Sequence, residues 1–137
     1  MTIADTSVLI DVLDRDENWM PWSRTQLEQA VTAGPLLTNH VVIAELSVYF
    51  GPEDSATRRL EDLGIGIVDL DVAAALRAGQ AFREYRRRGG TREAILADFP
   101  MAGHAAALGA LLLTRDKRRV GTYFPDFKLI TPENDNG

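Results

Sequence analysis

Four acidic residues stand beside apolar segments, where a neutral or apolar side chain would be the ordinary choice. Glu45 is the only charged residue in the run 36–52, and Asp98 directly precedes the uncharged run 99–114. Burying a carboxylate costs several kcal/mol unless the group is paired or bound to a cation. We therefore expect a shared cation site, whose members are Asp5, Glu45, Asp98 and Asp116.

The chemistry of such a site follows from its ligand type. The chain has no cysteine, which excludes thiolate metal sites, and carboxylate oxygens favour Mg²⁺, with Mn²⁺ as a substitute, over zinc or copper. A cluster of carboxylates repels itself until a divalent cation binds. Such an ion lowers the pKa of a water and neutralises charge on a phosphodiester. The predicted reaction class is metal-assisted phosphodiester hydrolysis.

Helix capping is the main alternative for the three aspartates. An Asp that precedes a helix commonly accepts hydrogen bonds from the first backbone N–H groups, which stabilises the helix by about 1 kcal/mol. For Asp5, Asp98 and Asp116 taken one at a time, capping remains open. Glu45 does not fit this account, because it lies inside a predicted helix on a stripe with Val42 and Tyr49. We expect it to be buried there.

Short apolar runs alternate along the chain with helical patterns. This alternation predicts a doubly wound α/β sandwich with a central, mostly parallel sheet of about five strands. The predicted strands are Thr2–Ala4, Leu36–Leu37, Gly66–Leu70, Ala110–Thr114 and Phe127–Ile130. The predicted helices are Thr6–Leu13, Trp22–Ala33, His40–Phe50, Asp54–Leu63, Val72–Arg88 and Asp98–Leu108. Sites in such sheets form beyond the carboxyl ends of the strands, where Asp5 and Asp116 are predicted to lie.

Local signals support the longest of these helices. Asp71 is placed to cap it, and an apolar stripe is predicted through Val72, Leu76, Gly79 and Phe82.

Length and composition limit the possible classes. A chain of 137 residues with 45% apolar and 26% charged residues is typical of one globular domain, expected over 1–131 with a frayed tail at 132–137. We expect neither a signal peptide nor a membrane span, since no basic and apolar leader opens the chain and no run reaches the ~20 apolar residues of a span. The absence of cysteine fits a cytoplasmic location.

Charge is distributed unevenly. Residues 1–71 carry a net charge of −9 and residues 72–137 a net charge of +4, within a total of −5. Six arginines and one glutamate lie in 77–92. Arginine pairs readily with phosphate, so an RNA-binding role is a candidate for Arg86, Arg87, Arg88 and Arg92. Favourable interaction with a helix C-terminus is the alternative explanation.

Taken together, four segments resemble the signature of PIN-domain nucleases. They are Asp5-Thr6-Ser7, Glu45 in an apolar helix after Thr38-Asn39, Asp98-Phe99 before an Ala-rich helix, and Thr114-Arg115-Asp116. The resemblance covers nearly the whole chain and is greatest to the VapC toxins of bacterial VapBC toxin–antitoxin pairs. It implies an Mg²⁺-dependent ribonuclease that acts on RNA, is usually a homodimer, and is neutralised by a co-encoded VapB-like antitoxin. It also implies that Asp5, Glu45, Asp98 and Asp116 form the catalytic, metal-binding site.

One segment departs from the family pattern. Many relatives carry an aliphatic helix start after the third acid, whereas Pro100 and Gly103 follow Asp98 here. Proline is tolerated in a first helical turn. The position of Asp98 relative to its helix is therefore the least determined feature of the predicted site.

Several neighbouring residues have weaker assignments. The hydroxyls of Thr6, Ser7 and Thr114 are candidates for orienting a carboxylate, with capping as the alternative. Asp11 is expected to be a solvated helix residue, and both histidines, His40 and His104, are expected to be structural. Trp19 and Trp22 either form a protein-contact surface or pack at a helix entry.

Two other functional classes remain as alternatives. A phosphoacceptor signalling domain would need a second acid beside Asp5 and would be phosphorylated at Asp69 or Asp71. The second alternative is a PIN-fold module that binds or processes RNA without a toxin role, or a PIN-fold module whose site is inactive.

Overall fold

The five described strands form one sheet in which every pairing is parallel. In this computed structural model the described residues are 1–51, 53–90, 99–115 and 128–132. The strand order is β3-β2-β1-β4-β5. The strands are β1 (Thr2–Ala4), β2 (Leu36–Thr38), β3 (Gly66–Ile67), β4 (Leu111–Leu113) and β5 (Lys128–Ile130). The predicted fold class is confirmed, and the sheet is parallel throughout these strands.

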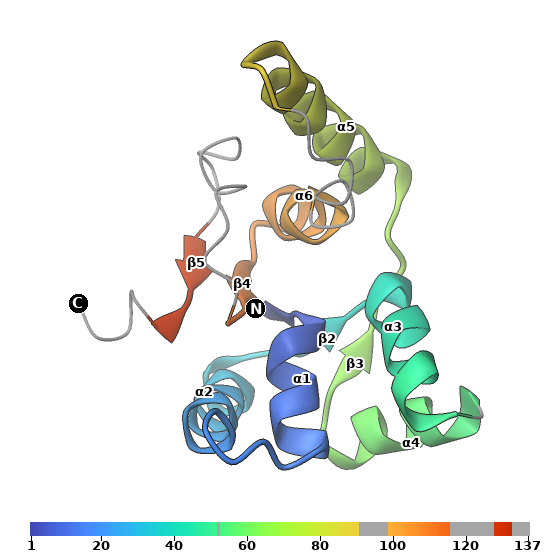
Figure 1. Cartoon of the computed structure of the whole chain (residues 1–137), viewed down its shortest axis with the longest axis vertical. Coiled ribbons are helices and arrows are strands. Elements are labelled where there is room, and N and C mark those ends of the chain that lie inside the picture. The colour runs from blue at the N-terminus through green and yellow to red at the C-terminus, as the bar shows by residue number, and fades with distance from the viewer. Residues whose placement is uncertain (52, 91–98, 116–127, 133–137) are drawn as a thin grey trace.

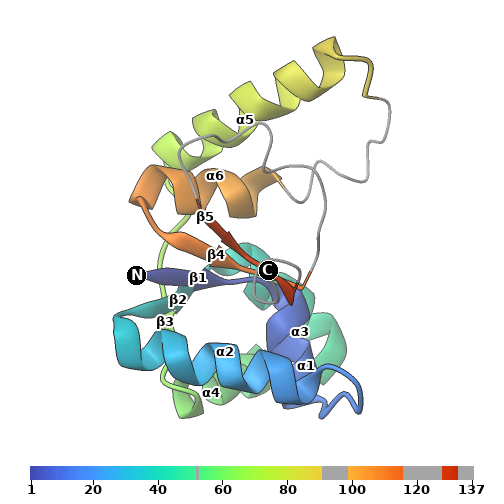
Figure 2. The same ribbon diagram turned by 90° about the vertical axis from the view of Figure 1, so that its left-hand side faces the viewer.

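The helices lie in two layers, one on each face of the sheet (Figures 1 and 2). On one face lie α1 (Thr6–Leu13), α2 (Met20–Ala33), α3 (His40–Phe50) and α4 (Glu53–Asp62). On the other lie α5 (Val72–Arg87) and α6 (Phe99–Leu108). Among the described residues, no helix combines the length and the apolar character needed to cross a bilayer.

The order of the strands places a topological switch point between β1 and β4. From β1 the chain builds outward to β2 and β3, and it then returns to add β4 and β5 on the other side. β1 and β4 pair directly, with Ala4 opposite Leu113. Ligands of open α/β sheets bind where the strand order reverses, beyond the carboxyl ends of the strands. Asp5 and Thr114 are the residues that follow these two central strands.

The element bounds differ from the predicted ones by a few residues. β3 ends at Ile67 although a strand to Leu70 was predicted, and only one backbone bond continues the pairing, from Val68 N to Thr38 O at 2.9 Å. α2 begins two residues earlier than predicted, with Pro21 in its first turn. Proline fits there because the first N–H groups of a helix have no intrahelical acceptor.

The predicted apolar stripe of α5 is wrong at Val72 and Leu76, although its last member, Phe82, does pack against the core. The buried positions are Ala74, Ala78 and Ala81, whereas Val72 and Leu76 are exposed. Small residues face α6 because the two helices pack closely: a Cβ on Gly103 would lie 2.8 Å from both Ala74 O and Ala78 N. A prediction of the buried face from hydrophobicity alone therefore fails for this helix, because closely packed helices need small residues at their contact.

The same contact explains the unusual start of α6. Pro100 is the second residue of the helix, where it breaks no intrahelical hydrogen bond. Gly103 is the residue that lets α6 approach α5. The departure from the family pattern is thus a packing feature of this chain.

Candidate functional site at the switch point

Asp5 stands at the N-terminus of α1 but does not cap it. Its backbone is extended, as in an N-cap, yet its side chain makes no capping hydrogen bond. The carboxylate oxygen Oδ2 instead accepts a 2.8 Å hydrogen bond from Thr114 Oγ1 and a longer one, 3.4 Å, from Ser7 Oγ. Capping, the alternative explanation of this aspartate, is excluded.

The backbone of the two central strands brings these three side chains together. Asp5 N donates to Leu113 O at 2.9 Å, which extends the β1–β4 pairing by one residue. Ser7 Oγ lies 3.3 Å from Thr114 Oγ1 and accepts a 3.1 Å bond from Arg115 N. Asp5 is half-buried and Thr114 is buried, so the carboxylate is held in a fixed orientation at the sheet edge.

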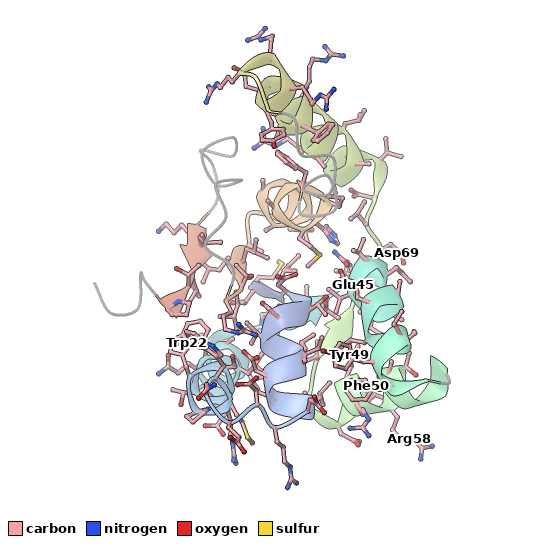
Figure 3. All side chains as sticks on the ribbon, in the orientation of Figure 1. Trp22, Glu45, Tyr49, Phe50, Arg58 and Asp69 are labelled. Carbon is pink, nitrogen blue, oxygen red and sulfur yellow. The ribbon has the colours of Figure 1, made fainter. Side chains whose placement is uncertain are left out.

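Glu45 lies on the exposed face of α3, so the expectation that it is buried is wrong. The core-facing residues of this helix are Val42 and Leu46, while Val48 and Tyr49 are exposed with Glu45. Figure 3 shows Glu45 toward the same end of α3 as Asp69, and Tyr49 toward the other end. Because α3 begins where β2 ends, Glu45 lies near the carboxyl edge of the sheet. Its membership of an acidic site stays a prediction.

The other two predicted acids, Asp98 and Asp116, lie outside the described residues. Their neighbours are described: α6 begins at Phe99, and Arg115 follows Thr114 at the end of β4. Within the described part of the chain, no three His, Asp or Glu side chains gather as a metal-binding group. Two of the four predicted acids lie outside the described residues, so the metal site stays a prediction.

Of the three hydroxyl residues, Ser7 and Thr114 contact Asp5 and Thr6 is set apart. Thr6 is buried and its Oγ1 has no hydrogen-bond partner. Orientation of Asp5 is therefore attributable to Ser7 and Thr114.

The two histidines differ. His104 is buried in α6, where its Nδ1 lies 3.0 Å from Nδ2 of Asn39, the residue whose Oδ1 caps α3. Since the Asn39 amide donates, His104 Nδ1 is the acceptor and the ring proton sits on Nε2. Burial lowers the pKa of His104 below its ordinary 6.5, against smaller raising effects of the Asp71 charge and of the Asp69 backbone. His40 is exposed, 3.7 Å from Asp69.

Asp11 is buried, so the expectation of a solvated helix residue is wrong. Its carboxylate receives two bonds from Arg115, from Nε at 2.9 Å and from Nη2 at 3.0 Å, and one from Ser23 Oγ at 2.6 Å. The Arg115 guanidinium also lies 5.1 Å from the Trp19 ring centre. Sequence reasoning missed this group, although Asp11 shares a helix face with buried Val8.

The arginines at the end of α5 are exposed. Arg87 and Arg88 both pair with Glu84, at 2.7 and 3.0 Å. In Figure 2, α5 ends on the side of the molecule toward which the strands run, where the candidate site lies. Arg92, the fourth predicted RNA contact, lies outside the described residues.

The PIN domain family matches residues 2–124, which is most of the chain. The chain belongs to the PIN domain family. PIN domains are nucleases, and this match decides against the signalling-domain alternative. In keeping with that, the Asp71 carboxylate caps α5 through Ala74 N at 2.9 Å. No curated protein sequence matches the chain significantly.

Solved structures of similar fold come from toxin–antitoxin complexes. The chain superimposes on VapBC2 from Rickettsia felis, bound to a promoter DNA fragment, with a TM-score of 0.73 and 17% identity, over 95% of this chain and 97% of that chain. VapBC-1 from nontypeable Haemophilus influenzae gives 0.70 and 18%, covering 95% and 96%. DNA-bound VapBC from Salmonella typhimurium gives 0.68 and 19%, also covering 95% and 96%. At these identities the likeness establishes the fold.

Proposed function

We propose that this PIN domain is an Mg²⁺-dependent endoribonuclease that acts in the cytoplasm as the toxin of a type II toxin–antitoxin pair. One observation carries the nuclease assignment. At the switch point of a PIN-family sheet, Asp5 leaves its helix uncapped and is oriented by Thr114 and Ser7. A helix gains stability when its N-cap is used, so a carboxylate held away from that role favours a functional one.

The proposed cation would be held by Asp5, Glu45, Asp98 and Asp116. Carboxylate oxygens suit Mg²⁺, and exposure of Glu45 fits a ligand that must reach an ion at the surface of the sheet edge. When bound, the ion would supply Lewis-acid activation of water and charge neutralisation at the phosphodiester. Thr114 and Ser7 fix the Asp5 carboxylate before the ion arrives, which reduces the ordering that binding requires.

RNA cleavage with matched variants tests the nuclease assignment. Purified protein is incubated with single-stranded and structured RNAs in Mg²⁺, with EDTA, and as Asp5→Asn and Asp98→Asn variants. Cleavage should require Mg²⁺ and be lost in both variants. Asp14→Asn, an exposed aspartate at the end of the same helix α1, should cleave normally. Cleavage that survives both EDTA and the two site variants would refute the assignment.

The partner proposed for the toxin role is a co-encoded antitoxin. The structures of similar fold named above are VapBC complexes, and this chain offers a fitting surface. A hollow of about 550 Å³ lies between α1, α2 and the segment 63–65. Apolar Leu27, Val31 and Ile65 line it together with charged Arg15 and Glu28. An apolar segment with charged flanks is the complement of such a surface.

A homodimer is the proposed form of the toxin. Four large apolar side chains are strongly exposed on two helices, Val48 and Tyr49 on α3, and Val72 and Leu76 on α5. Exposed apolar surface of this kind commonly marks a protein contact.

Two variants separate the two contacts. Leu76→Asp should give a monomer in light scattering and still capture the antitoxin. Val31→Asp should remain dimeric and lose the antitoxin, which is expected to be the product of the neighbouring reading frame. If both variants behave like the unchanged protein, neither surface is a contact.

The alternative is a PIN domain that processes RNA without a toxin role. Induced expression in a bacterial host distinguishes the two, because a toxin should arrest growth and an Asp5→Asn variant should not. Normal growth with an enzyme active in vitro would favour the processing role.

A further inference from the structure

The ion pair of buried Asp11 and half-buried Arg115 lies next to the candidate site, and Asp11 is not one of the four predicted acids. The Asp11 side chain is 1% exposed, and Arg115 grips it with two nitrogens in the fork geometry that arginine offers a carboxylate. Ser23 Oγ donates a third bond, 2.6 Å long, from α2. A carboxylate this deeply buried is tolerated because its oxygens are so fully bonded.

The Arg115 side chain is fixed in a second direction as well. Its guanidinium lies 5.1 Å from the centre of the Trp19 ring, and Trp19 packs edge-on against Trp22 at 6.4 Å. The two hydrogen bonds to Asp11 restrain the orientation of the guanidinium, and its contact with the Trp19 ring restrains it from another side. The arginine is therefore restrained by α1, by α2 and by the loop between them.

The backbone of Arg115 passes this restraint to Asp5. Arg115 N donates a 3.1 Å hydrogen bond to Ser7 Oγ. Ser7 Oγ in turn lies 3.3 Å from Thr114 Oγ1 and 3.4 Å from Asp5 Oδ2. Thr114, the residue before Arg115, makes the shortest contact with Asp5, at 2.8 Å. Movement of Arg115 would disturb both hydroxyls that orient the Asp5 carboxylate.

We infer that Arg115 and Asp11 are positioning residues for the Asp5 carboxylate, acting through the Arg115 backbone and the hydroxyls of Ser7 and Thr114. The inference rests on the proposed function, in which Asp5 binds a divalent cation. Asp11 is accordingly no cation ligand, since its two oxygens are occupied by Arg115 and Ser23.

A purely structural pair would act differently. If Asp11 and Arg115 only stabilised the fold, variants that remain folded would bind the cation as the unchanged protein does. If the pair positions Asp5, folded variants lose cation affinity. The two roles are therefore separated by a binding measurement made on folded protein, whatever the change in stability.

Titration calorimetry with Mn²⁺ alone is the test, on protein shown to be folded by circular dichroism. Arg115→Gln and Asp11→Asn should each bind Mn²⁺ about tenfold more weakly, the effect typical of groups that orient ligands. Arg115→Lys keeps the charge but lacks the fork, so it should restore only part of the affinity. The double variant should lose no more than either single one, because both act through one contact.

The control variant changes an exposed carboxylate at the end of the helix that carries Asp11. Asp14→Asn should leave Mn²⁺ affinity unchanged. If the folded Arg115 and Asp11 variants bind Mn²⁺ like the unchanged protein, the positioning role is refuted and the nuclease proposal stands. If the unchanged protein itself binds no Mn²⁺, both proposals fail together.

Discussion

Two aspartates at helix starts show how the same local sequence position serves different ends. Asp71 precedes α5 and accepts a 2.9 Å bond from Ala74 N, the ordinary capping contact. Asp5 precedes α1 and gives its carboxylate to side-chain hydroxyls instead. The difference lies in what surrounds them, because Asp5 follows the central strand β1, and the residue that follows the neighbouring strand β4 is Thr114, whose hydroxyl reaches the Asp5 carboxylate.

The hydroxyl of Thr114 should matter more than its volume. Thr114→Val keeps the shape of the side chain but removes the donor to Asp5, so RNA cleavage should fall about tenfold. Thr114→Ser keeps the donor and should restore most of the activity. Initial rates of cleavage at saturating Mg²⁺ provide the measurement. Equal rates in the Val and Ser variants would show that the hydrogen bond is dispensable.

His104 should make the stability of the fold depend on pH. Its pKa is lowered in the folded chain, chiefly by burial, so below pH 6.5 the unfolded chain binds a proton that the folded chain resists. The stabilising contribution is present above pH 6.5 and is lost as pH falls toward the lowered value. Urea unfolding at pH 7.5 and 5.5 should show a lower midpoint at pH 5.5.

Replacement of each histidine identifies the source of that dependence. His104→Gln should flatten the change of the urea midpoint between the two pH values, whereas His40→Gln, at the exposed histidine, should retain it. An unchanged slope in the His104 variant would assign the effect to other groups.

At the scale of elements, one glycine, Gly103, allows α5 and α6 to pack closely. A methyl group at Gly103 would meet two backbone atoms at 2.8 Å, so Gly103→Ala should lower the free energy of unfolding by about 2 kcal/mol. Gly79 lies in α5 with nothing within 4 Å of its added Cβ, so Gly79→Ala should raise stability by up to about 1 kcal/mol. Chemical unfolding of the two variants checks the opposite signs. Equal effects would contradict the close packing.

Element positions were predictable because they depend on local patterns. The strand predicted at Thr2–Ala4 has those bounds in the structure, the strand predicted at Ala110–Thr114 is shorter by one residue at each end, and Asp71 caps α5 as predicted. The parallel class of the sheet followed from the alternation of strands and helices.

Contacts between distant elements were less accessible. Asp11 finds its partner Arg115 104 positions away, and nothing in the spacing names that partner. The buried face of α5 was mispredicted because alanines were chosen there for size. Glu45 was expected in the core because its helix is apolar on more than one side, a pattern that does not say which side faces the sheet.

At the scale of the whole molecule, basic charge at the end of α5 lies on the side of the candidate site. If Arg86, Arg87 and Arg88 bind RNA phosphates, replacing all three by Gln should weaken RNA binding and lower its salt dependence. With single-stranded RNA, the slope of log affinity against log salt should fall by about 0.7 for each phosphate that is no longer bound. Binding titrations over roughly 50 to 200 mM salt, a range in which the affinity changes strongly with salt, measure this slope.

A control arginine comes from the opposite part of the molecule. Arg58 on α4 is exposed and lies far from α5 in Figure 3, so Arg58→Gln should leave the salt slope unchanged. The same slope in the triple variant and the unchanged protein would remove these arginines from the RNA-binding surface.

The contact between Asp5 and Thr114 has a consequence for the folding of the protein during its synthesis on the ribosome. It joins residues 109 positions apart, and β1 itself pairs with β4 across the same span. Such distant pairings form late, because the intervening chain must be made and closed into a loop first. A nascent or prematurely terminated chain that lacks β4 cannot orient Asp5. On the proposed function, the nuclease becomes active only after nearly all of the chain has been translated. The time needed for translation allows a neutralising partner to be present before the nuclease is active.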